Sequence, residues 1–193
     1  MNLAFDIDDT ITNSSDIFLK YAKLYNKENN IKHKILKNCL NQKEAFGWTK
    51  RDEKNFINKY LEKILIEAKP QRKALKVIKK LNKNNNIYLI TSRSKDELSN
   101  IEEITLNWLK KYNIDYKYLQ IGKISKGETC LHHDIKLFVD DNYQNCINVA
   151  NKCKCRVLLF DTRYNKKIKS CEIKRVKSWK EIEKKVKELQ NGK

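Results

Sequence analysis

Acidic and hydroxyl side chains follow three short apolar runs in the sequence. Each run has the length and composition of a buried β-strand. Ligands of open α/β sheets bind beyond the carboxyl ends of the strands, so we expect the residues that follow these runs to face one site. They are Asp6, Asp8, Asp9 and Thr10 after the first run, Thr91, Ser92 and Arg93 after the second, and Asp140 and Asp141 after the third.

Carboxylates that converge in this way raise one another's pKa unless a cation lies between them. Oxygen-only ligands favour Mg²⁺, which keeps water and a substrate phosphate in its shell. A hydroxyl and a lysine, Lys123 or Lys126, would bind the remaining phosphate oxygens. One carboxylate can then attack phosphorus and form an aspartyl phosphate, while a second serves as acid and base. The pattern therefore predicts phosphoryl-transfer chemistry.

Each motif also has a purely structural explanation. A D-x-D sequence after a strand is frequent in loops and caps, and Thr91 with Ser92 could simply cap the next helix. The order of the motifs, and the place of every one at the end of a strand, favours the catalytic interpretation.

The elements that would position these residues alternate between strand and helix. Helical apolar patterns separate the strand-like runs, and the last helix begins at a capping box of Ser178 and Glu181. This alternation predicts a three-layer α/β fold, in which helices cover both faces of a mostly parallel sheet. The expected strands are residues 2–7, 87–91, 116–121, 136–139 and 156–160.

The stretch between the first two expected strands is longer than one crossover connection needs. Its pattern is polar and helical, so we expect a helical cap over residues 14–68, inserted into a core of residues 1–13 and 69–193.

Aromatic residues in this expected cap could stack a nucleobase or pack the helices. The helical spacing of Phe56 and Tyr60 favours packing. Phe46 and Trp48 flank a predicted bend, where a binding role and a packing role both stay open.

The chain carries 42 basic and 24 acidic residues, which gives a formal net charge of +18. Nucleic acid is one partner class for such a charge. However, 36 of the basic residues are Lys, whereas proteins that recognise bases and phosphates lean on Arg. The composition therefore favours lysines on solvated faces, whose positive field attracts a small phosphorylated anion, over a nucleic-acid partner.

No run in the sequence approaches the roughly 18 apolar residues that a membrane span needs. The N-terminus turns acidic after a few apolar residues, which is not the pattern of a signal peptide. Six cysteines without an export signal indicate free thiols in a reducing compartment. We therefore expect a cytoplasmic protein without membrane contact, and an oligomer is compatible with this sequence.

Four sequence segments resemble, in order, the four motifs of the haloacid dehalogenase superfamily of phosphatases. They are DIDDT (residues 6–10), IYLITSR (87–93), a following lysine and LFVDD (137–141). The insertion after the first motif resembles a type-one cap. DIDDTITN and the block ALKVIKKL…IYLITSR are similar to the 5'(3')-deoxyribonucleotidase branch of the superfamily.

The resemblance implies a role for each motif. Asp6 would be the nucleophile, and Asp8 would protonate the leaving oxygen and then activate water. Mg²⁺ would be held by Asp6, the main-chain carbonyl of Asp8 and one of Asp140 and Asp141. Phosphate would contact Thr91, Ser92 and a lysine, for which Lys126 has the typical spacing and Lys123 is the rival, while Arg93 would face substrate or solvent.

The resulting expectation is a Mg²⁺-dependent phosphomonoesterase that dephosphorylates nucleoside or deoxynucleoside monophosphates through an aspartyl phosphate. One alternative is a phosphatase of another small metabolite, such as a sugar phosphate. A more distant alternative is a basic nucleic-acid-associated protein.

Overall fold

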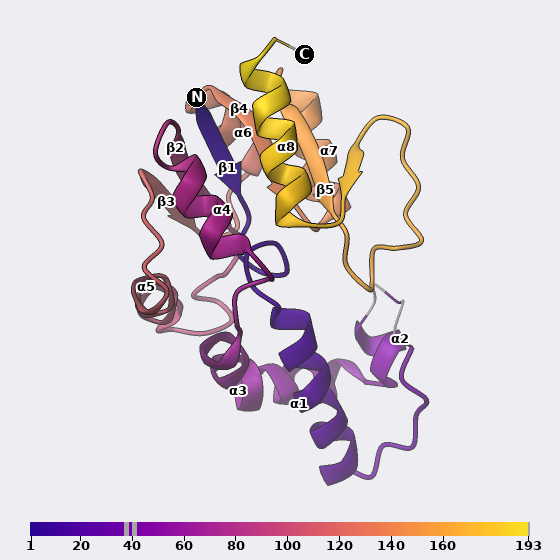
Figure 1. Cartoon of the computed structure of the whole chain (residues 1–193). Helices are drawn as coiled ribbons and strands as arrows, with labels where there is room; N and C mark the ends of the chain where they lie inside the picture. The colour runs from indigo at the N-terminus through magenta and orange to yellow at the C-terminus, as the bar shows by residue number, and fades with distance from the viewer. Residues whose placement is uncertain (37–38, 40–41, 193) are drawn as a thin grey trace.

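Six parallel strands form one sheet in the computed structural model, which describes residues 1–36, 39 and 42–192. The strand order is β3-β2-β1-β4-β5-β6, and each strand pairs in parallel with its neighbours (Figure 1). The predicted α/β fold with a mostly parallel sheet is therefore confirmed. The strands are β1 (Asn2–Phe5), β2 (Asn86–Thr91), β3 (Tyr118–Ile121), β4 (Ile135–Asp140), β5 (Arg156–Phe160) and β6 (Lys174–Val176).

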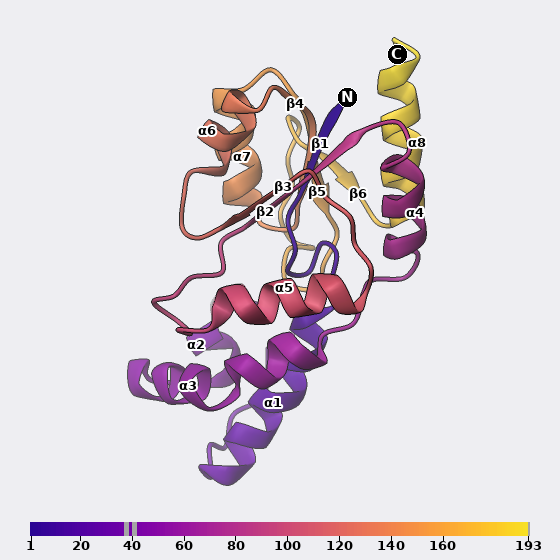
Figure 2. The same ribbon diagram turned by 90° about the vertical axis from the view of Figure 1, so that its left-hand side faces the viewer.

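Helices cover both faces of the sheet (Figure 2). α4 (Ala74–Leu81) and α8 (Trp179–Gln190) lie on one face, whereas α6 (Lys126–His132) and α7 (Tyr143–Lys152) lie on the other. α5 (Ile101–Lys111) runs between the sheet and the helices that follow β1.

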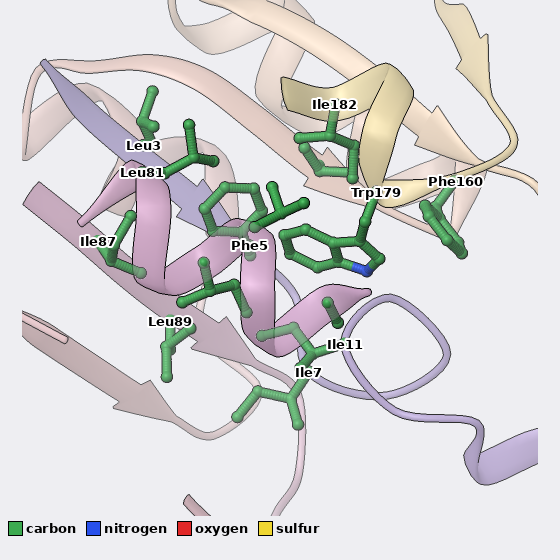
Figure 3. Packing of buried hydrophobic residues seen from close by; sticks show 14 of the residues in the cluster. Leu3, Phe5, Ile7, Ile11, Leu81, Ile87, Leu89, Phe160, Trp179 and Ile182 are labelled. Carbon is green, nitrogen blue, oxygen red and sulfur yellow. The ribbon is translucent and has the colours of Figure 1, made fainter. Parts of the chain in front are cut away.

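Alternating strand residues build the two cores. In β1, Leu3 and Phe5 face α4 and α8, whereas Ala4 belongs to the cluster on the opposite face. Figure 3 shows the first core, in which the indole of Trp179 lies beside Phe5, with ring centroids 5.2 Å apart. Apolar residues on both sides explain why the strands read as continuous apolar runs.

Three helices in the described part of the chain between β1 and α4 form a separate layer, which we call the helical insertion. They are α1 (Ser14–Glu28), α2 (Gln42–Phe46) and α3 (Lys50–Glu67). An aromatic cluster that includes Phe18, Tyr25, Trp48 and Phe56 fills the space between them. α3 also packs against α5, where Leu65 forms one buried apolar cluster with Ile101 and Ile104.

The predicted helical pattern of the insertion is wrong for residues 31–36. This segment is irregular, because α1 ends at Glu28 and Asn30 takes a left-handed φ of 54°. Ile31 and Ile35 mimic a helical stripe, but they pack on the aromatic cluster from irregular backbone. Part of the predicted helix, residues 37, 38, 40 and 41, lies outside the described residues.

The predicted capping box at α8 is formed only in part. Ser178 Oγ accepts a hydrogen bond from the Glu181 N–H, as predicted. The Glu181 carboxylate accepts from the N–H of Lys177 instead of that of Ser178, at 3.0 Å. Among the described residues, no helix has the length and apolarity needed to span a membrane.

Candidate active site

A cleft of about 910 Å³ lies between the helical insertion and the carboxyl ends of the strands. Its floor carries residues that follow β1, β2 and β4, which are neighbours in the sheet although they are far apart in sequence. The opposite wall is largely apolar and comes from the insertion. Its residues include Phe18, Leu19, Ile35, Phe46, Ile57, Leu61 and Ile64.

The chain turns back directly after β1, and this turn presents the first motif to the cleft. The N–H of Ile11 donates to the Ile7 carbonyl at 2.9 Å. Asp9 takes a φ of 55°, a left-handed conformation that Asp adopts more readily than most residues. Trp179 of α8 donates from Nε1 to the Thr10 carbonyl at 3.0 Å. The turn is thereby fixed to the core.

Three buried carboxylates meet at the base of the cleft. Oxygen atoms of Asp6, Asp140 and Asp141 lie within 4.8 Å of one another. Lys126, the first residue of α6, donates hydrogen bonds to Asp6 and, at 2.7 Å, to Asp140 Oδ2. Its side chain is 3% exposed, so the ammonium is held almost entirely by these carboxylates.

Burial governs the charge of this cluster. It raises the pKa of Asp6 to about 8, because the opposing effect of Lys126 is outweighed and Asp140 adds to the shift. Burial, followed by the charge of Asp140, also raises the pKa of Asp141 well above its ordinary value. When all three carboxyls are ionised, they carry more negative charge than Lys126 balances, which is a setting that a divalent cation stabilises.

The two neighbouring aspartates are held by different kinds of donor. A cation and N–H groups offset the negative charge of Asp140. The Asp141 carboxylate is instead oriented by hydrogen bonds from neutral hydroxyls. The donors to Asp140 are Lys126, the Asn142 N–H (2.7 Å) and the Asn145 amide (3.0 Å), and those to Asp141 are Thr10 Oγ1 (3.3 Å) and the Tyr164 hydroxyl.

Asp8 forms a two-point ion pair with Arg93. Nε of Arg93 lies 2.7 Å from Asp8 Oδ2, and Nη2 lies 2.9 Å from Oδ1. The third nitrogen donates to Thr105 Oγ1 at 3.0 Å, which fixes the guanidinium from behind. Burial raises the pKa of Asp8, but the charge and hydrogen bonds of Arg93 outweigh this and lower it overall. Asp8 is therefore ionised in this arrangement.

The remaining predicted phosphate contacts lie around the same floor. Thr91 ends β2 and is buried, and Ser92 follows it with an exposed side chain, so that both line the cleft. Of the two candidate lysines, Lys126 reaches the carboxylates. Lys123 is exposed at the rim, where it lies 3.4 Å from Glu97.

Comparison with known proteins identifies the family. The model of the family described as 5' nucleotidase, deoxy (pyrimidine), cytosolic type C matches residues 1–190. The chain belongs to this nucleotidase family. It is similar to a nucleotidase of Clostridium acetobutylicum, with 33% identity over 187 residues that cover 94% of this chain and 91% of that protein.

Solved structures give the same fold for this nucleotidase family member. A haloacid dehalogenase-like hydrolase of Streptococcus pneumoniae superimposes with a TM-score of 0.70 at 12% identity, covering 96% of this chain and 97% of that one. A haloacid dehalogenase-type hydrolase of Bacillus subtilis bound to magnesium gives 0.63 at 14% identity, with coverage of 96% and 97%. The family match identifies a phosphoric monoester hydrolase. These likenesses show that it has the fold of haloacid dehalogenase-type hydrolases.

The aromatic residues of the nucleotidase's insertion divide into two groups. Phe46 lines the cleft. Trp48 is 5% exposed, lies outside the cleft wall and donates from Nε1 to Asn26 Oδ1 at 2.6 Å. The exposed binding position considered for Trp48 is therefore not supported. Phe56 and Tyr60 are buried in the same cluster, in agreement with the predicted packing.

The sequence motifs do not cover one segment that reaches the cleft. Arg163 and Tyr164 lie in the segment between β5 and β6, and both line the cleft. This segment lacks apolar periodicity, so the sequence pattern gives it no place in the fold. Its position just beyond the end of a predicted strand, β5, is the one signal that could have pointed to it.

Proposed function

We propose that this nucleotidase hydrolyses nucleoside and deoxynucleoside monophosphates, with Mg²⁺ and through an aspartyl phosphate on Asp6. The observation that carries the proposal is the meeting of Asp6, Asp140 and Asp141 with Lys126 at the base of a cleft with a largely apolar opposite wall. The polar floor suits a phosphate, and the apolar wall suits a nucleobase.

The acidic cluster fits a hard divalent cation. Its donors are oxygens, its charge when ionised exceeds that of Lys126, and a fold relative has been solved with magnesium bound. We assign Asp6, Asp141 and the Asp8 carbonyl as the ligands, because Lys126 and two N–H groups already offset the charge of Asp140, whereas the donors to Asp141 are neutral hydroxyls. When bound, the ion would polarise the phosphate and offset its negative charge.

Asp6 is the group that attacks phosphorus. Its Oδ forms a bond to phosphorus while the ester P–O bond breaks, and the leaving oxygen takes a proton from Asp8. Water then attacks the phosphoryl group and gives a proton to Asp8, which releases inorganic phosphate and restores the Asp6 carboxylate. Lys126 and the Thr91 hydroxyl bind oxygens of the transferring group.

The ion pair between Asp8 and Arg93 suits the second step of this cycle better than the first. An ionised Asp8 can accept a proton from water, as the second step requires. In the first step Asp8 must carry a proton, so it has to be freed from Arg93. A bound phosphate attracts the guanidinium and would weaken its hold on Asp8.

We further propose that residues 14–68 act as a cap over a core of residues 1–13 and 69–193. The cleft lies between these two parts, so the insertion determines which leaving group fits. Phe46 and Phe18 lie on that wall, with ring centroids 5.7 Å apart, and present aromatic surface to a base.

A substrate panel tests the proposal. Release of inorganic phosphate is measured for purine and pyrimidine nucleoside monophosphates, ribo and deoxy, beside sugar phosphates at equal concentration. Higher kcat/KM for the nucleotides supports a nucleotidase. Higher kcat/KM for a sugar phosphate favours the alternative, in which the same chemistry serves another small metabolite.

A further inference from the structure

The segment between β5 and β6 reaches from the sheet toward the helical insertion (Figure 1). Through Tyr164 it contacts the acidic cluster, and through Arg163 it contacts the start of α1. Neither residue belongs to a motif that the proposed mechanism uses.

The Tyr164 hydroxyl lies against two carboxylates of the site. It donates to Asp141 Oδ2 and lies 3.2 Å from Asp9 Oδ2. One hydroxyl has one proton, and the shorter contact is the one with Asp141. Thr10 Oγ1 donates to the other oxygen of Asp141 at 3.3 Å. Two neutral donors therefore fix the direction of this carboxylate without cancelling its charge.

Buried contacts hold the segment in place. The Asn165 amide donates to the carbonyls of Asp141 and Phe160, each at 2.8 Å, and Asn165 is fully buried. Arg175 of β6 donates to Asn165 Oδ1 at 2.6 Å. Tyr164 is thus carried by a fixed backbone next to Asp141, which is the condition for orienting a ligand group.

A second anchor joins the segment to the insertion. Arg163 Nη2 donates to the Ser15 carbonyl at 3.1 Å and lies 3.0 Å from Asp16 Oδ1, both in the first turn of α1. The N–H of Ser15 donates to Asp9 Oδ1 at 2.7 Å. Arg163 and Asp9 therefore both contact the first turn of α1.

We propose that Tyr164 is a positioning residue, whose hydroxyl orients Asp141 for the divalent cation. The inference rests on the proposed function only in taking Asp141 as a metal ligand. Groups that hydrogen-bond to metal ligands fix their orientation, and their loss weakens metal binding. Tyr164 has this relation to Asp141 from outside the catalytic motifs.

The test compares Tyr164→Phe, which removes only the hydroxyl, with Tyr143→Phe as a matched control. Tyr143 stands two residues after Asp141, and its ring packs against the cluster on the other face of the sheet. Its hydroxyl makes no hydrogen bond to the part of the chain that is described. Mg²⁺ binding is read without substrate, from the rise of Tm as MgCl₂ is added.

Tyr164→Phe should raise the Mg²⁺ concentration needed for half of the Tm shift by about tenfold, whereas Tyr143→Phe should leave it unchanged. The Mg²⁺ concentration for half-maximal activity should rise in parallel, with little change in KM for the nucleotide at saturating Mg²⁺. This split separates positioning of the metal ligand from general damage to the cleft.

The proposal would be overturned if both variants showed the same Mg²⁺ response as the unsubstituted protein. It would also be overturned if both variants lost Mg²⁺ affinity to the same extent. A protein whose Tm ignores Mg²⁺ would contradict it as well. The Mg²⁺ response of Tm does not depend on the substrate. If the protein hydrolyses nucleotides but Tyr164→Phe leaves this Mg²⁺ response unchanged, only this inference is contradicted. A Tyr164-dependent Tm shift without nucleotide hydrolysis contradicts the proposed function alone.

Discussion

The Lys126 ammonium donates a hydrogen bond to the Asp6 carboxylate from a helix 120 residues further along the chain. The same ammonium bonds to Asp140 at 2.7 Å. This contact links the first motif to the fourth, and it holds the lysine where the transferring phosphoryl group would develop charge. It also makes Lys126 a structural element, because two buried carboxylates depend on it.

Replacing the two candidate lysines should therefore have unequal effects. Lys126→Met leaves Asp6 and Asp140 buried without a cation, which should cost roughly 3–5 kcal/mol of stability and lower activity by about 10²-fold or more. Lys123→Met, at a side chain that is 54% exposed, should change stability by less than about 0.5 kcal/mol. Urea unfolding and phosphate release measure both. Greater damage from Lys123→Met would contradict the assignment.

The raised pKa of Asp6 predicts how the metal-free protein responds to pH. The folded state holds a proton on Asp6 up to a pKa of about 8, whereas the ordinary value is 3.8. Between these values the unfolded chain binds fewer protons, so the free energy of unfolding falls as pH rises. Asp9, with a pKa raised to about 6, acts in the same direction.

The Asp6→Asn variant isolates this effect in EDTA. As pH falls toward the ordinary pKa of 3.8, its Tm should approach that of the unsubstituted protein, because Asp6 is then protonated in both the folded and the unfolded chain. At pH 8 the variant should melt a few degrees higher, since 1 kcal/mol moves the Tm of a domain of this size by roughly 2–4 °C. Thermal unfolding followed by circular dichroism measures the difference. A constant Tm difference across this range would contradict the raised pKa.

Removal of divalent metal should stop turnover. When ionised, the acidic cluster of Asp6, Asp140 and Asp141 repels a phosphate dianion unless a cation offsets its charge. EDTA should therefore reduce phosphate release to background, and excess Mg²⁺ should restore it, whereas KCl of equal ionic strength should not. Turnover that is indifferent to the chelator would count against the metal site.

Phe46 and Trp48 should separate substrate binding from stability. Phe46→Leu removes aromatic surface from the cleft wall and should raise KM for a nucleotide by about fivefold or more. Trp48→Phe removes the hydrogen bond to Asn26, which should cost about 1–3 kcal/mol of stability and leave KM unchanged. Steady-state kinetics and urea unfolding distinguish the two. The reverse pattern would show that Trp48 contacts substrate.

The sequence was sufficient to predict the parallel sheet and the convergence of Asp6, Asp140 and Asp141. Buried parallel strands leave long apolar runs, and their order brings the residues after them to one edge. Other features depend on tertiary contacts that leave no periodic signal. Tyr164 meets Asp141 only because the segment after β5 folds back, and β6 is three residues long.

The insertion shows a related limit. Its apolar residues between α1 and α2 have helical spacing, yet the described part of that segment, residues 31–36, is irregular, because packing on the aromatic cluster outweighs local pattern. Arg93 was expected to face substrate or solvent, but it is buried and paired with Asp8. This pairing depends on β1 and β2 being neighbours in the sheet, and the sequence pattern does not give the order of the strands.

The central claim is that Asp6 attacks phosphorus, and Asp6→Asn tests it most directly. The control is Asp134→Asn, which changes an exposed aspartate that pairs with Lys136 at the surface. Initial rates of phosphate release from a nucleoside monophosphate are compared at saturating Mg²⁺, with circular dichroism to verify folding. The account predicts background rates for Asp6→Asn and normal rates for Asp134→Asn. Near-normal hydrolysis by a folded Asp6→Asn protein would contradict it.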